Sequence, residues 1–110
     1  DISNIYPIHL AASNGSVNRV TMLHESGADL DVISVNGKSP LHYAAITDNS
    51  PVIEYLIEHD VDINRKDFIL ECTPCLYASI FSCIRSVLVL IKAGCNIHAT
   101  DSTGRNILHY

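Results

Sequence analysis

The chain has 110 residues and a formal net charge of −5 at neutral pH. It is long enough for one compact domain, but it lacks the clustered Lys and Arg of proteins that bind nucleic acids or anionic membranes. Hydrophobic residues make up 47% of it, only 6% are aromatic and tryptophan is absent, which predicts helices packed through aliphatic side chains. The longest apolar run, residues 87–91, is far shorter than the roughly 20 residues of a membrane span. We therefore expect no membrane insertion and no nucleic-acid partner.

The sequence repeats itself with a period of 33 or 34 residues. A first marker recurs as Pro7-Ile8-His9-Leu10-Ala11-Ala12, Pro40-Leu41-His42-Tyr43-Ala44-Ala45, Pro74-Cys75-Leu76-Tyr77-Ala78-Ser79 and Ile107-Leu108-His109-Tyr110. A second recurs as Gly27-Ala28-Asp29-Leu30-Asp31, Asp60-Val61-Asp62-Ile63-Asn64 and Gly94-Cys95-Asn96-Ile97-His98. A fixed period of this length is typical of stacked supersecondary units, none of which buries its apolar face alone.

Each repeat is expected to contain two helices. The first begins at the proline of the first marker, because proline at the first helical position lacks only an N–H that would be unpaired anyway. Ser39 and Thr73 precede two of these prolines and are suitable N-caps. In the second repeat this predicts a first helix over residues 40–47, and the apolar spacing predicts a second helix over residues 51–59.

The second helix of each repeat is expected to end at a residue with left-handed backbone. Gly27 and Gly94 occupy this position in the first and third repeats, and glycine adopts the left-handed region without steric cost. Asp60 takes the same place in the second repeat, at some strain. Connecting hairpins are expected over residues 32–38, 65–72 and 99–105, with turns at Asn36-Gly37 and Thr103-Gly104.

The two markers resemble the ankyrin repeat family, whose signature reads Thr-Pro-Leu-His-x-Ala-Ala followed by Gly-Ala-Asp-x-Asn. The resemblance implies an all-α ankyrin-repeat solenoid of stacked helix-turn-helix units with β-hairpin loops, forming one domain over residues 1–110. The expected repeats are residues 1–33, 34–66 and 67–100, with a partial fourth over 101–110. Because the chain starts at Asp1 rather than Met and stops within a repeat, we expect a piece of a longer protein.

The family resemblance implies a protein–protein interaction module that binds a partner protein through hairpin tips and the concave helix face. Two alternatives remain open: a structural spacer in a long ankyrin array, such as the cytosolic part of a channel or adaptor, and a regulatory or targeting domain of an enzyme. The residues themselves carry no catalytic arrangement and no phosphate-binding loop, so we expect no enzymatic activity and no cofactor. As a fragment, the chain is expected to be monomeric.

The histidines of the first marker, His9, His42 and His109, share one repeat position. They could be imagined as a metal or catalytic cluster, but the resemblance implies a structural role in which each ring binds the preceding hydroxyl and the neighbouring turn backbone. Ser39–His42 keeps this hydroxyl–histidine pair. The other repeats depart from it at Tyr6, Leu76 and Asn106.

The four cysteines are Cys72, Cys75, Cys83 and Cys95. Cys72 and Cys75 have the CxxC spacing of a redox pair or half a zinc site. Cys75, however, occupies the position of Ile8 and Leu41, which favours a small core side chain and no metal site. Four unpaired thiols are typical of a reducing compartment, so we expect a cytoplasmic or nuclear protein.

The third repeat carries the candidate partner-binding residues. Its hairpin is one residue longer than the others and contains three consecutive apolar residues at an expected turn, where such residues are uncommon without a reason. Two further apolar residues stand at the end of its first helix. The candidates are Phe68, Ile69, Leu70, Ile80 and Phe81. Partner contact and internal packing both remain open for them. Asn64 resembles the asparagines that a cytosolic oxygenase hydroxylates in ankyrin repeats, the alternative being a structural bridge between hairpins.

Overall fold

A computed structural model describes residues 7–110 of the chain. Within this range the protein consists of three helix pairs and one short 3₁₀ helix, η1, and no strand is present. The helices of the first two pairs are α1 (Pro7–Asn14), α2 (Val17–Glu25), α3 (Pro40–Ile46) and α4 (Ser50–Glu58). The third pair is α5 (Pro74–Ile80) and α6 (Ile84–Lys92), and η1 covers Ile107–His109. The all-α class expected from the sequence is confirmed.

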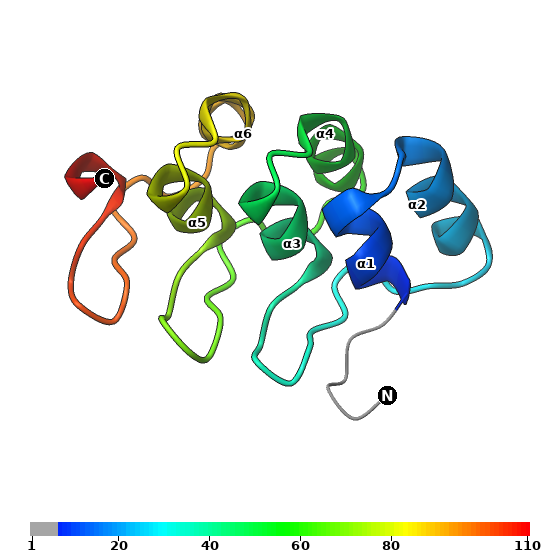
Figure 1. Cartoon of the computed structure of the whole chain (residues 1–110), viewed down its shortest axis with the longest axis horizontal. Helices are drawn as coiled ribbons and strands as arrows, with labels where there is room; N and C mark the ends of the chain where they lie inside the picture. The colour runs from blue at the N-terminus through cyan, green and yellow to red at the C-terminus, as the bar shows by residue number, and fades with distance from the viewer. Residues whose placement is uncertain (1–6) are drawn as a thin grey trace.

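The helices are arranged in two rows (Figure 1). The first helices of the pairs, α1, α3 and α5, lie side by side and form one row that continues to η1. The second helices, α2, α4 and α6, form the other row, and the three connecting loops all project to one side of the stack. None of the helices among residues 7–110 combines the length and apolarity needed to cross a membrane.

Capping residues fix where the first helices begin. The Ser39 hydroxyl accepts the amide of His42, and the His42 ring accepts the amide of Ser39, which together form a capping box at the start of α3. The Thr73 hydroxyl accepts the amide of Leu76 in the same way at α5. The first helix expected over 40–47 runs Pro40–Ile46, and the second helix expected over 51–59 runs Ser50–Glu58. Residues 1–6, with the start of the first repeat and Tyr6, lie outside the described residues.

Left-handed residues end the second helices as expected. Gly27 and Gly94 have φ of 102° and 92°, and Asp60 has φ of 59°. Each connecting loop is named here after the repeat that it begins, so the second loop covers residues 32–38, the third 65–72 and the fourth 99–105. The loops follow a hairpin course, but each is closed by a few backbone bonds rather than by a strand ladder. The Ser34 amide bonds the Lys38 carbonyl four residues on, whereas the Asp67 amide bonds the Cys72 carbonyl five residues on. The third loop therefore holds one more residue than the second.

The core is aliphatic and continuous through the stack. Its main cluster holds small alanines from the first helices together with Val, Leu and Ile side chains from the second helices. A smaller cluster is formed by Cys72, Leu76 and Tyr77, with Ile80 packed against it. Cys75 lies in the main cluster and Cys72 in the smaller one, so the CxxC spacing places the two side chains in different packing environments.

Candidate functional site

The tip of the third loop exposes three apolar side chains. Phe68 is 64% exposed, Ile69 is 60% exposed and Leu70 is 45% exposed. Exposed apolar side chains that adjoin one another are a feature of interaction sites. The loop projects on the same side as its neighbours (Figure 1), so its tip lies at the edge of the row formed by α1, α3 and α5.

Backbone hydrogen bonds hold this tip between its two neighbours. The Phe68 amide donates to the Asn36 carbonyl of the second loop at 2.8 Å. On the other side, the Ser102 amide of the fourth loop donates to the Leu70 carbonyl, also at 2.8 Å. The apolar tip is thus part of a row of linked loops, and its backbone is ordered without a partner.

A buried carboxylate anchors the base of the third loop. Asp67 accepts the Cys72 amide at 2.8 Å, the Lys38 ammonium at 3.1 Å and the Tyr77 hydroxyl. Burial raises the pKa of Asp67, but the bonds from Tyr77, Cys72 and Lys38 outweigh it, and the net pKa is lowered. The pKa of Tyr77 is raised by burial and by its bond to this carboxylate. The group therefore stays a charged carboxylate that ties the loop to α5 and to the second loop.

The end of α5 carries the other two candidates. Phe81 follows the helix, is 55% exposed and stacks on Tyr77 with ring centroids 6.5 Å apart. Ile80 is half-buried and packs on the smaller core cluster, so it supports the surface rather than standing out from it.

The five candidates lie in two groups with Tyr77 between them. The Tyr77 hydroxyl bonds Asp67, the residue next to Phe68, while its ring stacks on Phe81. Tyr77 is almost fully buried and therefore links the base of the third loop to the end of α5, while the single apolar patch expected from the sequence stays a prediction. We define the third-repeat surface as the loop tip at Phe68, Ile69 and Leu70, the end of α5 at Ile80 and Phe81, and the Tyr77 bridge.

Sequence reasoning missed three residues around this surface. Val35 is 59% exposed at the tip of the second loop, next to the residue that binds Phe68. Its apolar character at an expected turn was a usable signal. Lys38 and Tyr77 contribute through their contacts with Asp67 and each other, the ammonium lying 5.3 Å from the ring centroid. No local sequence pattern predicts the contact between Lys38 and Tyr77, because the two residues belong to different repeats.

The marker histidines bind the turn backbone. His9 Nε2 donates to the Val32 carbonyl at 2.7 Å and His42 Nε2 donates to the Cys72 carbonyl at 2.9 Å. Burial lowers the pKa of His42 to about 4 and also lowers that of His9. His109 keeps half of the expected pattern even without a hydroxyl neighbour, because its ring accepts the Asn106 amide. The hydrogen bonds of these rings to neighbouring backbone give the marker histidines a structural role.

The cysteine thiols are buried among residues 7–110. Burial raises the pKa of Cys72 to about 11 and raises that of Cys83. The Cys75 thiol donates a hydrogen bond to Cys95, which together with burial raises the pKa of Cys75 and lowers that of Cys95. A thiol must be ionised to act as a nucleophile or metal ligand, so the positions of Cys72, Cys75 and Cys83 favour packing over chemistry. No group of three or more potential metal ligands occurs in the described part of the chain.

Asn64 has a structural partner. Its side chain is on the exposed edge of the stack, where Oδ1 accepts the Asn96 amide of the next repeat at 2.8 Å. Asp31 Oδ1 accepts the Asp62 amide one repeat earlier at 3.2 Å. The expected bridge between neighbouring repeats is therefore present, and hydroxylation of Asn64 stays a prediction.

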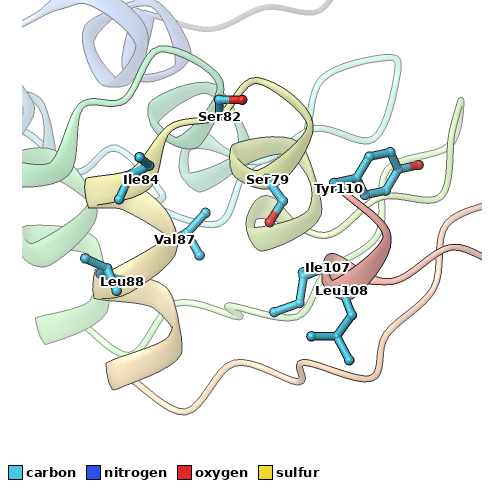
Figure 2. A pocket seen from close by; sticks show the side chains of 8 residues that line it. All are labelled: Ser79, Ser82, Ile84, Val87, Leu88, Ile107, Leu108 and Tyr110. Carbon is cyan, nitrogen blue, oxygen red and sulfur yellow. The ribbon is translucent and has the colours of Figure 1, made fainter.

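A second apolar feature lies beyond α6. A groove of about 340 Å³ is bounded by the end of α5, by α6 and by the C-terminal segment around η1 (Figure 2). Ile84 and Leu88 of α6 line it and are 69% and 61% exposed. Ile107, Leu108 and Tyr110 line its other side.

The similarity of the chain to known proteins agrees with its repeat pattern. A family model described as ankyrin repeats (3 copies) matches residues 1–67. The chain is 36% identical over 104 residues to palmitoyltransferase AKR1 of Lachancea kluyveri, and the aligned region covers 92% of this chain and 14% of that protein. It is 33% identical over 105 residues to the human ankyrin and armadillo repeat-containing protein, covering 94% of this chain and 7% of that protein. It is 32% identical over 105 residues to human Rabankyrin-5, covering 94% of this chain and 9% of that protein.

The chain thus spans a small part of the length of these relatives, 14% in the first of them. The activity in the name of the palmitoyltransferase therefore belongs to that protein and is not carried over to this segment, and the ankyrin family is generally non-enzymatic. The family match covers more than half of the chain. This chain belongs to the ankyrin-repeat family, whose repeats are generally protein–protein interaction modules within larger proteins.

Proposed function

We propose that this chain binds a partner protein through the third-repeat surface, with the hairpin tips and the concave row of first helices as the binding face. The observation that carries the proposal is the exposed run Phe68-Ile69-Leu70, which is held in place by backbone bonds from both neighbouring loops. Hot spots of interfaces are enriched in aromatic side chains surrounded by contacts that exclude water. A surface that is already ordered loses little conformational entropy when it binds.

The chemistry of the third-repeat surface indicates what kind of partner it binds in this proposal. Its exposed side chains are aromatic and aliphatic, so the partner is expected to present an apolar anchor. The chain carries a net charge of −5, which favours basic residues flanking that anchor through electrostatic steering. The chain acts as a monomer in this proposal, and its four free thiols suit a reducing compartment, the cytoplasm or nucleus.

The proposal is tested by measuring binding and stability on the same variants. A peptide selected on the wild-type chain from a random displayed library serves as the probe. Phe68→Ala and Phe81→Ala are expected to weaken its binding about thirtyfold, equivalent to about 2 kcal/mol. Their unfolding free energies should fall by less than the roughly 3–5 kcal/mol that a buried phenylalanine costs.

Met22→Ala is the matched control. Met22 is 68% exposed on α2, so its truncation removes a comparable exposed apolar side chain from another part of the molecule. Unchanged affinity in both phenylalanine variants would reject the third-repeat surface and move the binding site to the inner face of the first two repeats. A loss of several kcal/mol of stability in each variant would assign both rings to internal packing.

A structural spacer is the second candidate, and the groove beyond α6 favours it. Ile84 and Leu88 stand where α4 has Ser50 and Glu54, so the last helix pair offers a more apolar face than the pair before it. In a stack, such a face is stabilised by the next unit. Appending a helical unit that covers this groove is expected to raise the unfolding midpoint while leaving peptide binding unchanged. An unchanged midpoint would remove the support for a spacer.

A further inference from the structure

Two histidines from different repeats meet on the outer row of helices. His24 lies in the last turn of α2, and His59 is the residue that caps the end of α4. Their ring centroids are 4.8 Å apart and their planes are at 85°. His59 is exposed and His24 is half-buried, so solvent reaches the pair.

Tyr55 orients both rings. His59 Nδ1 lies 2.9 Å from the Tyr55 carbonyl oxygen, which can only accept, so Nδ1 carries the proton and Nε2 keeps a free lone pair. His24 Nδ1 lies 2.9 Å from the Tyr55 hydroxyl. That oxygen can accept or donate, and in the tautomer in which it accepts, Nε2 of His24 is available as a ligand. In metal sites, a ligating histidine generally donates its other ring N–H to an oxygen in this way.

The neighbouring interface has different residues at these positions. The positions of His24, Tyr55 and His59 recur one repeat later as Ile57, Val89 and Ala93. Those three residues line the groove between α4 and α6. The chain thus places two imidazoles and a phenol between α2 and α4 at positions where the next pair of outer helices has aliphatic side chains.

We propose that His24 and His59 form a two-histidine site for a borderline divalent cation such as Zn²⁺, which joins α2 to α4. Imidazole suits this class of ion, with Zn–N bonds of about 2.0–2.1 Å. Two imidazoles on one tetrahedral ion then have ring centroids about 5 Å apart, which the observed 4.8 Å matches. Water or a carboxylate from a binding partner fills the remaining positions, since no third ligand joins the pair within residues 7–110.

Thermal unfolding with added Zn²⁺ or with a chelator tests the site. Zn²⁺ binds the folded pair and not the separated histidines, so it should raise the unfolding midpoint in proportion to the logarithm of its concentration above the dissociation constant. His24→Ala and His59→Ala are each expected to weaken binding at least about tenfold. His98→Ala, which removes an exposed loop histidine, is the control and should keep the full shift.

Isothermal titration supplies a measurement that does not depend on unfolding. One Zn²⁺ per chain is expected at pH 7.5, with weaker binding at pH 5.5 because both imidazoles must be neutral to bind. His24→Asn and His59→Gln serve if the alanine variants fold poorly, since they keep polar side chains of similar size. A zinc response of undiminished size in the double variant, or no saturable binding to the wild-type chain, would overturn the proposal.

Discussion

The ring of Phe68 lies directly on Gly37 of the preceding loop. A β-carbon built on Gly37 would come within 2.6 Å of two ring carbons of Phe68, and the Phe68 amide donates to the carbonyl of the adjacent Asn36. One face of an exposed aromatic side chain therefore packs on a glycine, and a larger residue there would require the ring or the loop to shift. Gly37 also has φ of 79°. Glycine at this position therefore allows both the left-handed backbone of the turn and the contact with the Phe68 ring.

Substitution of Gly37 is expected to depend on Phe68. Gly37→Ala should cost about 1–2 kcal/mol for the left-handed backbone alone and more because of the clash with the ring. In a Phe68→Ala background only the backbone cost should remain. Urea unfolding of the four chains in this double-mutant cycle measures the coupling. Equal costs of Gly37→Ala in the two backgrounds would show that the ring moves away freely.

Asp67 is expected to be the most sensitive charged residue of the third loop. Asp67→Ala removes the acceptor for Lys38, Tyr77 and the Cys72 amide, and leaving such groups unpaired should cost about 3 kcal/mol of unfolding free energy. Asp101→Ala is the matched control, because Asp101 holds the same position in the next loop but is half-exposed. Chemical unfolding compares the two, and a smaller loss for Asp67 than for Asp101 would contradict the anchoring role.

Acid is expected to destabilise the fold through its buried histidines. The pKa of His42 is about 4 in the folded chain and about 6.5 when unfolded. Between these values the unfolded state binds more protons than the folded state. The contribution of neutral His42 to the unfolding free energy is therefore complete above pH 6.5 and is lost as the pH falls toward 4. One such histidine contributes a slope of at most about 1.4 kcal/mol per pH unit.

His42→Gln removes this titration while keeping a polar side chain at the third position of the helix. The pH dependence of its unfolding free energy between pH 7 and 5 should be shallower than that of the wild-type chain. His98→Gln, in an exposed loop, should keep the wild-type slope. Parallel curves for His42→Gln and the wild-type chain would assign the acid sensitivity to other groups.

The thiols are expected to be protected in the folded chain. All four are buried, so their reaction with Ellman's reagent at pH 7.5 should be about two orders of magnitude slower than in denaturant. The time course of absorbance change gives the rates and the number of thiols that react in each phase. Fast reaction of one or more thiols in native buffer would show that the third repeat opens locally.

Much of the fold could be read from local sequence. The prolines preceded by Ser39 and Thr73 mark helix starts through chemistry confined to a few residues, and glycines such as Gly27 mark helix ends. The additional residue in the third loop was equally visible, because it lengthens one period. The exposure of the loop tip followed from its place at a turn between helices.

The arrangement of side chains around the candidate site was harder to predict from the sequence. Five residues were expected in one patch; the structure adds that the buried Tyr77 ring stacks on Phe81 and that Ile80 packs against the core. The first marker places Tyr77 on a helix, but its neighbours depend on how the helix rotates against the adjoining loop. The sequence pattern could not supply that rotation.

The sequence by itself determined the repeat, the helix boundaries and the ankyrin family, because those depend on signals within one unit that recur at a fixed step. Only the tertiary structure decided which units touch through which side chains. Phe68 with Gly37, Lys38 with Asp67, and His24 with His59 each join residues about one repeat apart. Such pairs form when stacking brings equivalent surfaces together, and their chemistry depends on the side chains in which neighbouring repeats differ.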